Sequence, residues 1–101
     1  MNLVQILLPL NDNKGKPLPR GHYRVIKTEL ANRFKGLTVY GRAPAEGIWK
    51  PGKSTKIDEI VVYEVMVPRI NRQWWRQYRS KLERLFRQQS IVIRTQEVTV
   101  L

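Results

Sequence analysis

Two residues of this chain, Glu64 and His22, suit acid–base chemistry, and Arg42 can supply a charged partner; the three lie far apart in the sequence. Glu64 is the lone carboxylate within the apolar run I-V-V-Y-E-V-M-V, and His22 is the only histidine. A carboxyl group among apolar side chains needs a partner or takes up a proton, while histidine titrates near neutral pH. Glu64, His22 and Arg42 are therefore the candidate catalytic residues. The sequence leaves open whether the chain is an enzyme.

Each of these residues also has a purely structural interpretation. Glu64 can form an ion pair with Arg94 or Arg42 from neighbouring strands. His22 follows P-R-G at the start of an expected helix, where a histidine serves as a surface or capping residue. The alternative is a polar site in an apolar cleft. The residues expected around such a cleft are Trp49, Tyr63, Glu64, Arg42 and Arg94, with His22 nearby.

A different chemistry is indicated by the segment 71–89, which combines aromatic residues with arginines. At about 100° per residue on a helix, its large apolar side chains share about a third of the circumference: Trp74, Trp75, Tyr78, Leu82, Leu85 and Phe86. Guanidinium groups offer forked donors that suit phosphate oxygens. The candidate anion-binding residues on the other side are Arg72, Arg76, Arg84 and Arg87. The alternative is that this charged face is only solvated.

The charge of the whole chain agrees with an anionic partner. Lys and Arg number 19 against 8 Asp and Glu, which gives a formal net charge of +11. Such an excess favours nucleic acid or an acidic protein as the partner, although many small basic proteins use their charge only for solubility. The sequence gives no preference between DNA and RNA.

Several other functions are disfavoured by what the sequence lacks. It contains no cysteine, and one histidine with scattered carboxylates matches no metal-ligand spacing, so we expect no metal site. Neither glycine-rich phosphate-binding motif occurs, and we expect no cofactor. No secretory signal or membrane-spanning run is recognisable, which predicts a cytoplasmic protein that does not enter membranes.

The elements that must position these residues alternate between strands and helices. We expect strands at 3–10, 37–42, 57–67 and 91–101, and helices at 23–34 and 71–89. Asn71 is a suitable N-cap for the second helix, which Ser90 ends, and the first helix stops at Lys35-Gly36. Between the second and third strands, the Gly- and Pro-rich stretch 42–52 reads as a long loop. Its Trp49 can pack on the sheet or cover a ligand.

This order of elements defines the fold class that we expect for residues 1–101, a single domain. It is the α+β, ferredoxin-like βαββαβ arrangement, with a four-stranded antiparallel sheet of order 4-1-3-2. Right-handed crossovers place both helices on one face of the sheet. The two central strands then carry only one aromatic residue, Tyr63, so RNA binding by base stacking on the sheet is not expected.

The other face of this sheet is expected to be apolar as well. The strand at 57–67 has two rows of side chains: Val61, Tyr63, Val65 and Val67 on one face, and Ile60, Val62, Glu64 and Met66 on the other. A sheet that is wetted on one face alternates apolar with polar residues instead. Leaving several hundred Å² of apolar surface in water would forgo about 10 kcal/mol. We therefore expect a homodimer that packs through this second face, with a ligand cleft or a different subunit as the alternatives.

Two stretches of the chain support a resemblance. The segments G-L-T-V-Y-G-R-A-P-A-E-G-I-W and W-W-R-Q-Y-R-S-K-L-E, in this order of elements, resemble small bacterial ferredoxin-like domains of unassigned function. Many relatives of that architecture form dimeric α+β barrels, and some are cofactor-free monooxygenases or isomerases with a His, Arg or carboxylate in the cleft. The resemblance implies a shape and a dimer, and it assigns no site residue to this chain.

Overall fold

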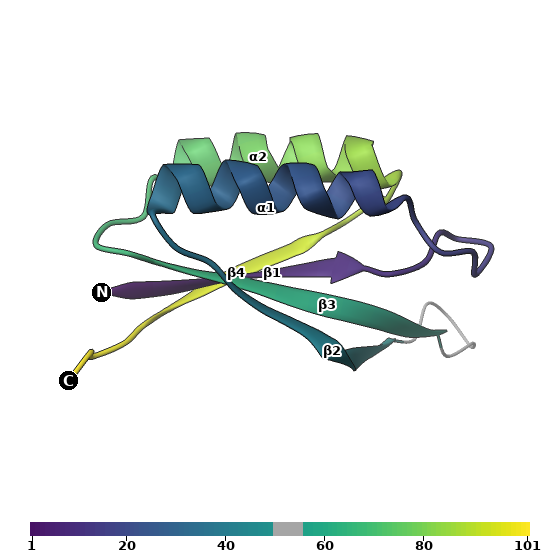
Figure 1. Ribbon diagram of the computed structural model, residues 1–101, viewed down its shortest axis with the longest axis horizontal. Coiled ribbons are helices and arrows are strands. Elements are labelled where there is room, and N and C mark those ends of the chain that lie inside the picture. Colours follow the sequence, from purple (N-terminus) through teal and green to yellow (C-terminus); the bar gives the residue numbers. More distant parts are fainter. Residues whose placement is uncertain (50–55) are drawn as a thin grey trace.

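The computed structural model of the protein describes the backbone of residues 1–49 and 56–101, and the side chains of 1–40 and 59–101. The elements follow in the expected order. They are β1 (Asn2–Pro9), α1 (Arg20–Phe34), β2 (Thr38–Trp49), β3 (Lys56–Val67), α2 (Arg72–Phe86) and β4 (Val92–Glu97). Both helices lie side by side on one face of the sheet, which Figure 1 shows edge-on.

The sheet is antiparallel, with the strand order β2-β3-β1-β4. This order is the predicted one, and it places β1 and β3 in the centre. In the register of the central pair, Gln5 lies opposite Glu64 and Ile6 opposite Tyr63. The predicted ferredoxin-like fold is therefore confirmed.

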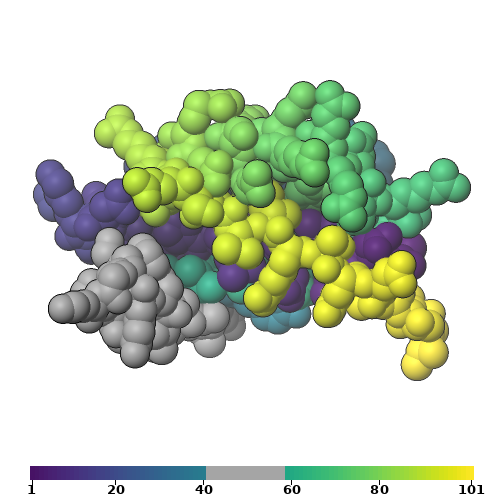
Figure 2. All heavy atoms as spheres, turned by 180° about the vertical axis from the view of Figure 1, so that it is seen from behind, coloured from purple at the N-terminus to yellow at the C-terminus, as the bar shows by residue number. Residues whose placement is uncertain are grey.

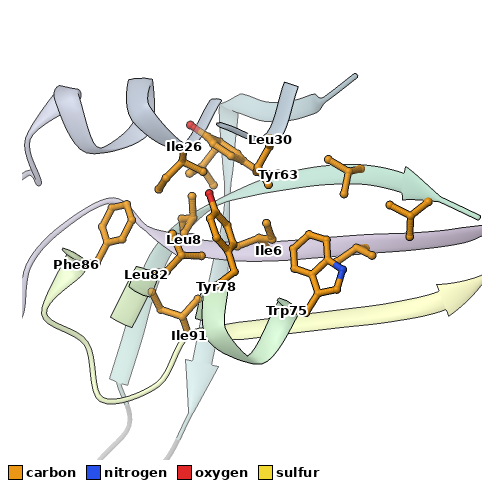
Figure 3. Close-up of a cluster of buried hydrophobic side chains, with 14 residues drawn as sticks. Ile6, Leu8, Ile26, Leu30, Tyr63, Trp75, Tyr78, Leu82, Phe86 and Ile91 are labelled. Carbon is orange, nitrogen blue, oxygen red and sulfur yellow. The ribbon is translucent and has the colours of Figure 1, made fainter. Parts of the chain in front are cut away.

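The core lies between the helices and the sheet, and both sequence periodicities contribute to it. Alternation in the two central strands buries every second residue over 4–8 in β1 and over 61–67 in β3. From the helices come Ile26 and Leu30 of α1, and the 3.6-residue periodicity of α2 adds its aromatic face. Figure 3 shows the side chains that meet there: Ile6, Leu8, Ile26, Leu30, Tyr63, Trp75, Tyr78, Leu82, Phe86 and Ile91.

Helix α2 begins as its sequence predicts but ends earlier. The Asn71 side-chain oxygen accepts a hydrogen bond from the Trp74 amide at 3.1 Å, which is an N-cap. The helix ends at Phe86, and Arg87 follows in the left-handed conformation with φ 52°. The predicted end at Ser90 is therefore wrong. The Arg87 amide donates to the carbonyl oxygens of Glu83 and Arg84, which closes the helix before Ser90 is reached.

Helix α1 packs on α2 through aromatic rings. Phe34 stacks on Trp75 with ring centroids 5.2 Å apart, and it meets Trp74 edge-on at 5.4 Å. The Arg33 guanidinium lies 4.2 Å from the centre of a Trp74 ring, on a bulky aromatic surface that attracts cations. Lys35 ends α1 in the left-handed conformation, one residue before the glycine that we expected to serve there.

The segment after Tyr40 differs from the prediction. We expected a loop over 42–52, but β2 continues to Trp49 as a strand paired with β3. Tyr40 lies opposite Val62 and Ala45 opposite Ile60, so the pairing is irregular between them. An irregularity of this kind lets a strand continue through a sequence in which apolar and polar residues do not alternate. For that reason the Gly- and Pro-rich sequence was mistaken for a loop. Strand β4 ends at Glu97, earlier than expected.

No described residue covers the second face of the sheet (Figure 1). Exposed on it are Tyr40 (52%), Met66 (48%) and Val92 (50%), and neighbouring Leu7 and Val62 are half-buried. Both rows of β3 are thus largely apolar, as predicted. Within the described residues, neither helix is long and apolar enough to cross a membrane.

Candidate anion-binding site

A shallow, open groove of about 280 Å³ runs between α2 and β4. This edge of the molecule faces the viewer in Figure 2, with α2 above β4. Nine residues line the groove: Val4, Ile70, Arg72, Trp75, Arg76, Arg79, Ile93, Arg94 and Thr95. None of the nine is acidic, and four are arginines. We call this cavity the α2–β4 groove.

Three of these arginines come from one stripe of α2. Arg72, Arg76 and Arg79 stand at positions i, i+4 and i+7, which share a face of a helix. The helical rise places their Cα atoms within about 10 Å along the axis. All three side chains belong to exposed residues. Among the described residues the one ion pair joins Lys81 of α2 to Glu29 of α1, so no described carboxylate forms an ion pair with this stripe.

The position of the stripe on the helix adds to its positive potential. The amino-terminal end of a helix carries a partial positive charge, and a cation placed there costs about 0.3–1 kcal/mol. Arg72 is the first residue of α2, and the first turn holds no acidic residue. The arrangement therefore opposes helix stability and concentrates positive charge at one end of the groove. An anion bound there would remove that repulsion.

The four predicted anion-binding residues are divided by the structure. Arg72 and Arg76 line the α2–β4 groove, whereas Arg84 and Arg87 are exposed near the other end of α2 and do not line it. Arg87 lies just beyond the helix, as its C-cap. Arg79 was missed because it borders the buried side of the helix. A residue at the edge of the buried side of α2 can face the neighbouring strand β4, as Arg79 does.

A row of hydrogen-bonded polar side chains crosses the uncovered face of the sheet. Arg94 Nε donates to Gln5 Oε1 at 2.8 Å, and Gln5 Nε2 donates to Glu64 Oε1 at 2.5 Å. The Tyr40 hydroxyl donates to Glu64 Oε2 at 3.2 Å. This hydrogen bond and the nearby negative charge of Glu64 raise the pKa of Tyr40. We call these four residues the polar row.

The polar row corrects the expected surroundings of Glu64. Arg94 was one of two expected ion-pair partners of Glu64, with Arg42, but the Gln5 amide stands between Arg94 and Glu64 and bonds to both. Gln5 was not predicted because its role depends on the register, which sets Gln5 opposite Glu64 on one side and opposite Arg94 on the other. The guanidinium of Arg94 is thus engaged on the uncovered face, and Arg94 cannot be counted with the three arginines of α2.

Other candidate residues are not brought together with Glu64. Tyr63 is 1% exposed and packs on the helix side of the sheet, opposite to the face that carries Glu64. His22 lies in α1, with its ring edge-on to Phe86 at a centroid distance of 5.5 Å. The side chains of Arg42 and Trp49 lie outside the described residues. The expected cleft around Glu64 is therefore not assembled from Tyr63 and His22.

The described side chains also bear on metal chemistry. Among them, no group of three or more His, Asp or Glu residues lies close enough together to hold a metal ion.

Burial raises the pKa of Tyr63 to about 12, and burial likewise raises the pKa of Tyr23 to about 12. These hydroxyls are therefore neutral core groups near pH 7. Neither is poised to act as a base.

The fold and the groove together define a small ferredoxin-like α+β protein with a basic helix. Its fold is similar to that of a solved structure, a mutant of CutA1 from Pyrococcus horikoshii OT3. The TM-score is 0.59 at 10% sequence identity, and the match covers 100% of this chain and 86% of the other. At this identity the likeness concerns the fold alone. No family model and no curated protein matches the chain.

Proposed function

We propose that this protein is a non-enzymatic, self-associating binder of an anionic partner, which it contacts through the arginines of α2. The partner is a nucleic acid or an acidic protein, as the net charge of +11 favours. One observation carries the proposal: Arg72, Arg76 and Arg79 line a groove that contains no acidic residue. Arg84 and Arg87 extend the positive surface toward the other end of α2.

The structure supports binding more than catalysis. The α2–β4 groove contains no carboxylate and no histidine, so it lacks a group that could move a proton near neutral pH. Its arginines remain charged at every physiological pH and offer several donors to an anion. An arrangement of fixed donors without an acid or base suits recognition.

The test is the salt dependence of binding to a short fluorescent oligonucleotide. Log affinity should fall linearly with log salt, with a slope of about −0.7 per neutralised phosphate on a single strand. In Arg76→Gln the slope should become shallower by about 0.7, because one phosphate contact is lost. Fluorescence anisotropy between about 50 and 500 mM salt measures both.

The matched control is Arg24→Gln, which removes the same charge from an exposed position on α1. Its slope should stay near that of the original chain. An affinity that is indifferent to salt would reject the proposal. Binding of a polyglutamate peptide, but not of an oligonucleotide, would identify the partner as an acidic protein.

A second candidate function rests on the polar row. Glu64, joined to Gln5 and Tyr40 on an otherwise apolar face, is the polar group expected of a small-molecule site or a cofactor-free enzyme. In this candidate, Arg42, Trp49 and Arg94 would stand near the ligand. Soaking crystals with a mixture of small carboxylic acids and amides tests it. Ligand density beside Glu64 would favour it, and none there would leave the polar row a structural feature.

A further inference from the structure

A negative charge near the end of the α2–β4 groove restricts which anion the groove can hold. Glu83 lies on the same face of α2 as the stripe of arginines, one turn beyond Arg79, because it stands eleven residues after Arg72. Glu83 is fixed there: its Oε2 accepts a hydrogen bond from the Ile91 amide at 3.0 Å. A polyanion running along the whole stripe would meet this negative charge. The groove therefore suits a compact anionic group more than a continuous track of phosphates.

The charge in the groove matches a doubly charged group. Arg72, Arg76 and Arg79 have no described carboxylate partner, their Cα atoms lie within about 10 Å along the helix axis, and Arg72 stands at the positive end of the α2 dipole. A terminal phosphate monoester carries about −1.5 to −2 charges and three strong acceptor oxygens. A phosphodiester within a strand has only one charge. The monoester gains more from three forked donors.

The floor of the groove indicates what accompanies the phosphate. Ile70 and Ile93 are half-buried, and Val4 and Trp75 are almost fully buried beneath them. These side chains give an apolar surface, but Trp75 is only 7% exposed and offers no open ring face for a base. The floor therefore suits the apolar side of a sugar. Base recognition by stacking is not provided.

From these features we infer that the α2–β4 groove is a subsite for a terminal phosphate monoester on a nucleoside, held by Arg72, Arg76 and Arg79 with its sugar on Ile70 and Ile93. The inference rests on the proposed function and makes it specific. Two sources share this chemistry: the phosphorylated end of a nucleic acid strand and a free mononucleotide. In both, recognition is independent of the base sequence.

The experiment compares two labelled oligonucleotides of one sequence, with a 5′-phosphate or a 5′-hydroxyl end, binding to the full chain. We expect the phosphorylated strand to bind about tenfold more tightly, as charge-assisted hydrogen bonds to an extra charge imply. Arg76→Gln and Arg79→Gln should each abolish most of this preference. Arg24→Gln should keep it. Far-ultraviolet circular dichroism confirms that each variant is folded.

Each outcome supports or overturns the phosphate-monoester subsite, the proposed function or both. Equal affinity for both strands, with salt-dependent binding retained, overturns the subsite while the proposed function stands. Binding to neither strand overturns both. A preference that persists in Arg76→Gln and Arg79→Gln also overturns the subsite. Adenosine monophosphate is the competitor: displacement at concentrations near the oligonucleotide Kd supports the subsite with a free nucleotide as the source, and weaker displacement supports it with a strand end.

Discussion

At the scale of single residues, the hydroxyl of Tyr78 is the least favourable group in the core. It is the one buried side-chain polar atom without a hydrogen-bond partner among the described residues. A buried donor left unpaired costs about 1–3 kcal/mol. Tyr78→Phe removes this unpaired hydroxyl and retains the ring and its stacking on Trp74. The substitution should therefore raise the free energy of unfolding by about 1 kcal/mol. Urea denaturation measures the change.

The matched comparison is Tyr23→Phe, the same chemical change at a hydroxyl that is paired. Tyr23 donates to the Pro9 carbonyl oxygen. Its removal should lower the free energy of unfolding by about 1 kcal/mol, because the carbonyl loses its partner. Equal effects of the two substitutions would mean that the Tyr78 hydroxyl has a partner in solution.

The tyrosines also predict how stability depends on pH. Burial raises the pKa of Tyr23 and Tyr63 from 10.0 to about 12, and burial also raises the pKa of Tyr78. The folded chain thus holds these hydroxyls neutral where the unfolded chain ionises them. Their contribution to stability is complete below pH 10 and is lost as the pH rises from 10 toward 12.

Tyrosinate absorbance near 295 nm gives the measurement. The native titration should lie well above that of the urea-unfolded chain, and the urea midpoint should decline from pH 10 upward. A native titration with a midpoint near 10 for all four tyrosines would contradict the burial of Tyr23, Tyr63 and Tyr78.

At the scale of elements, the end of α1 stores backbone strain. Lys35 has φ 60°, and a side chain in the left-handed region costs about 1–2 kcal/mol. Lys35→Gly should therefore raise the free energy of unfolding by about 1 kcal/mol, as glycine is the usual residue at this cap. Lys35→Ala is the control, since it removes the same charge and keeps the Cβ atom. Thermal unfolding that ranks alanine equal to glycine would rule out this explanation.

Most elements were predictable because their periodicity is strong. The 100° spacing in α2 selected six residues. Of these, Trp74 and Leu85 are half-buried, and the other four are buried: Trp75, Tyr78, Leu82 and Phe86. Alternation in β3 likewise placed Tyr63 in one row with Val61, Val65 and Val67, and this whole row is buried, although Tyr63 was expected beside Glu64. Features that depend on contacts between elements were not predictable: the bulge after Tyr40 breaks the pattern of β2, and Gln5 matters only through its register.

The candidate site was predictable in part for the same reason. Arg72 and Arg76 were selected by their distance from the aromatic face of α2, and both line the groove. Arg79 lies closer to the buried side, and only the position of β4 reveals that it faces a cavity. The sequence also could not show that Arg84 lies away from the groove, because nothing local marks where the neighbouring strand ends.

At the scale of the whole molecule, the uncovered face of the sheet carries an exposed apolar row. Tyr40, Leu7, Val62 and Val92 occupy one continuous row across four strands, since Leu7 lies opposite both Val62 and Val92 and Tyr40 lies opposite Val62. Every member of the row is at least partly exposed. A contiguous apolar row of this kind is typical of an interaction surface. The proposed homodimer would bury it against a second copy.

If the proposed homodimer packs through this row, Val62→Lys should convert it to single subunits. The side chain points away from the helices, so the core is untouched, but a lysine at the centre of the row would bury an unpaired charge in the interface. Sedimentation velocity over a concentration series should show a dimer for the original chain and a monomer for the variant. Gln77→Lys, which adds the same charge to an exposed position on α2, is the control and should remain dimeric. If the original chain itself sediments as a single subunit at high concentration, the uncovered face has another occupant, and self-association must be dropped from the proposed function.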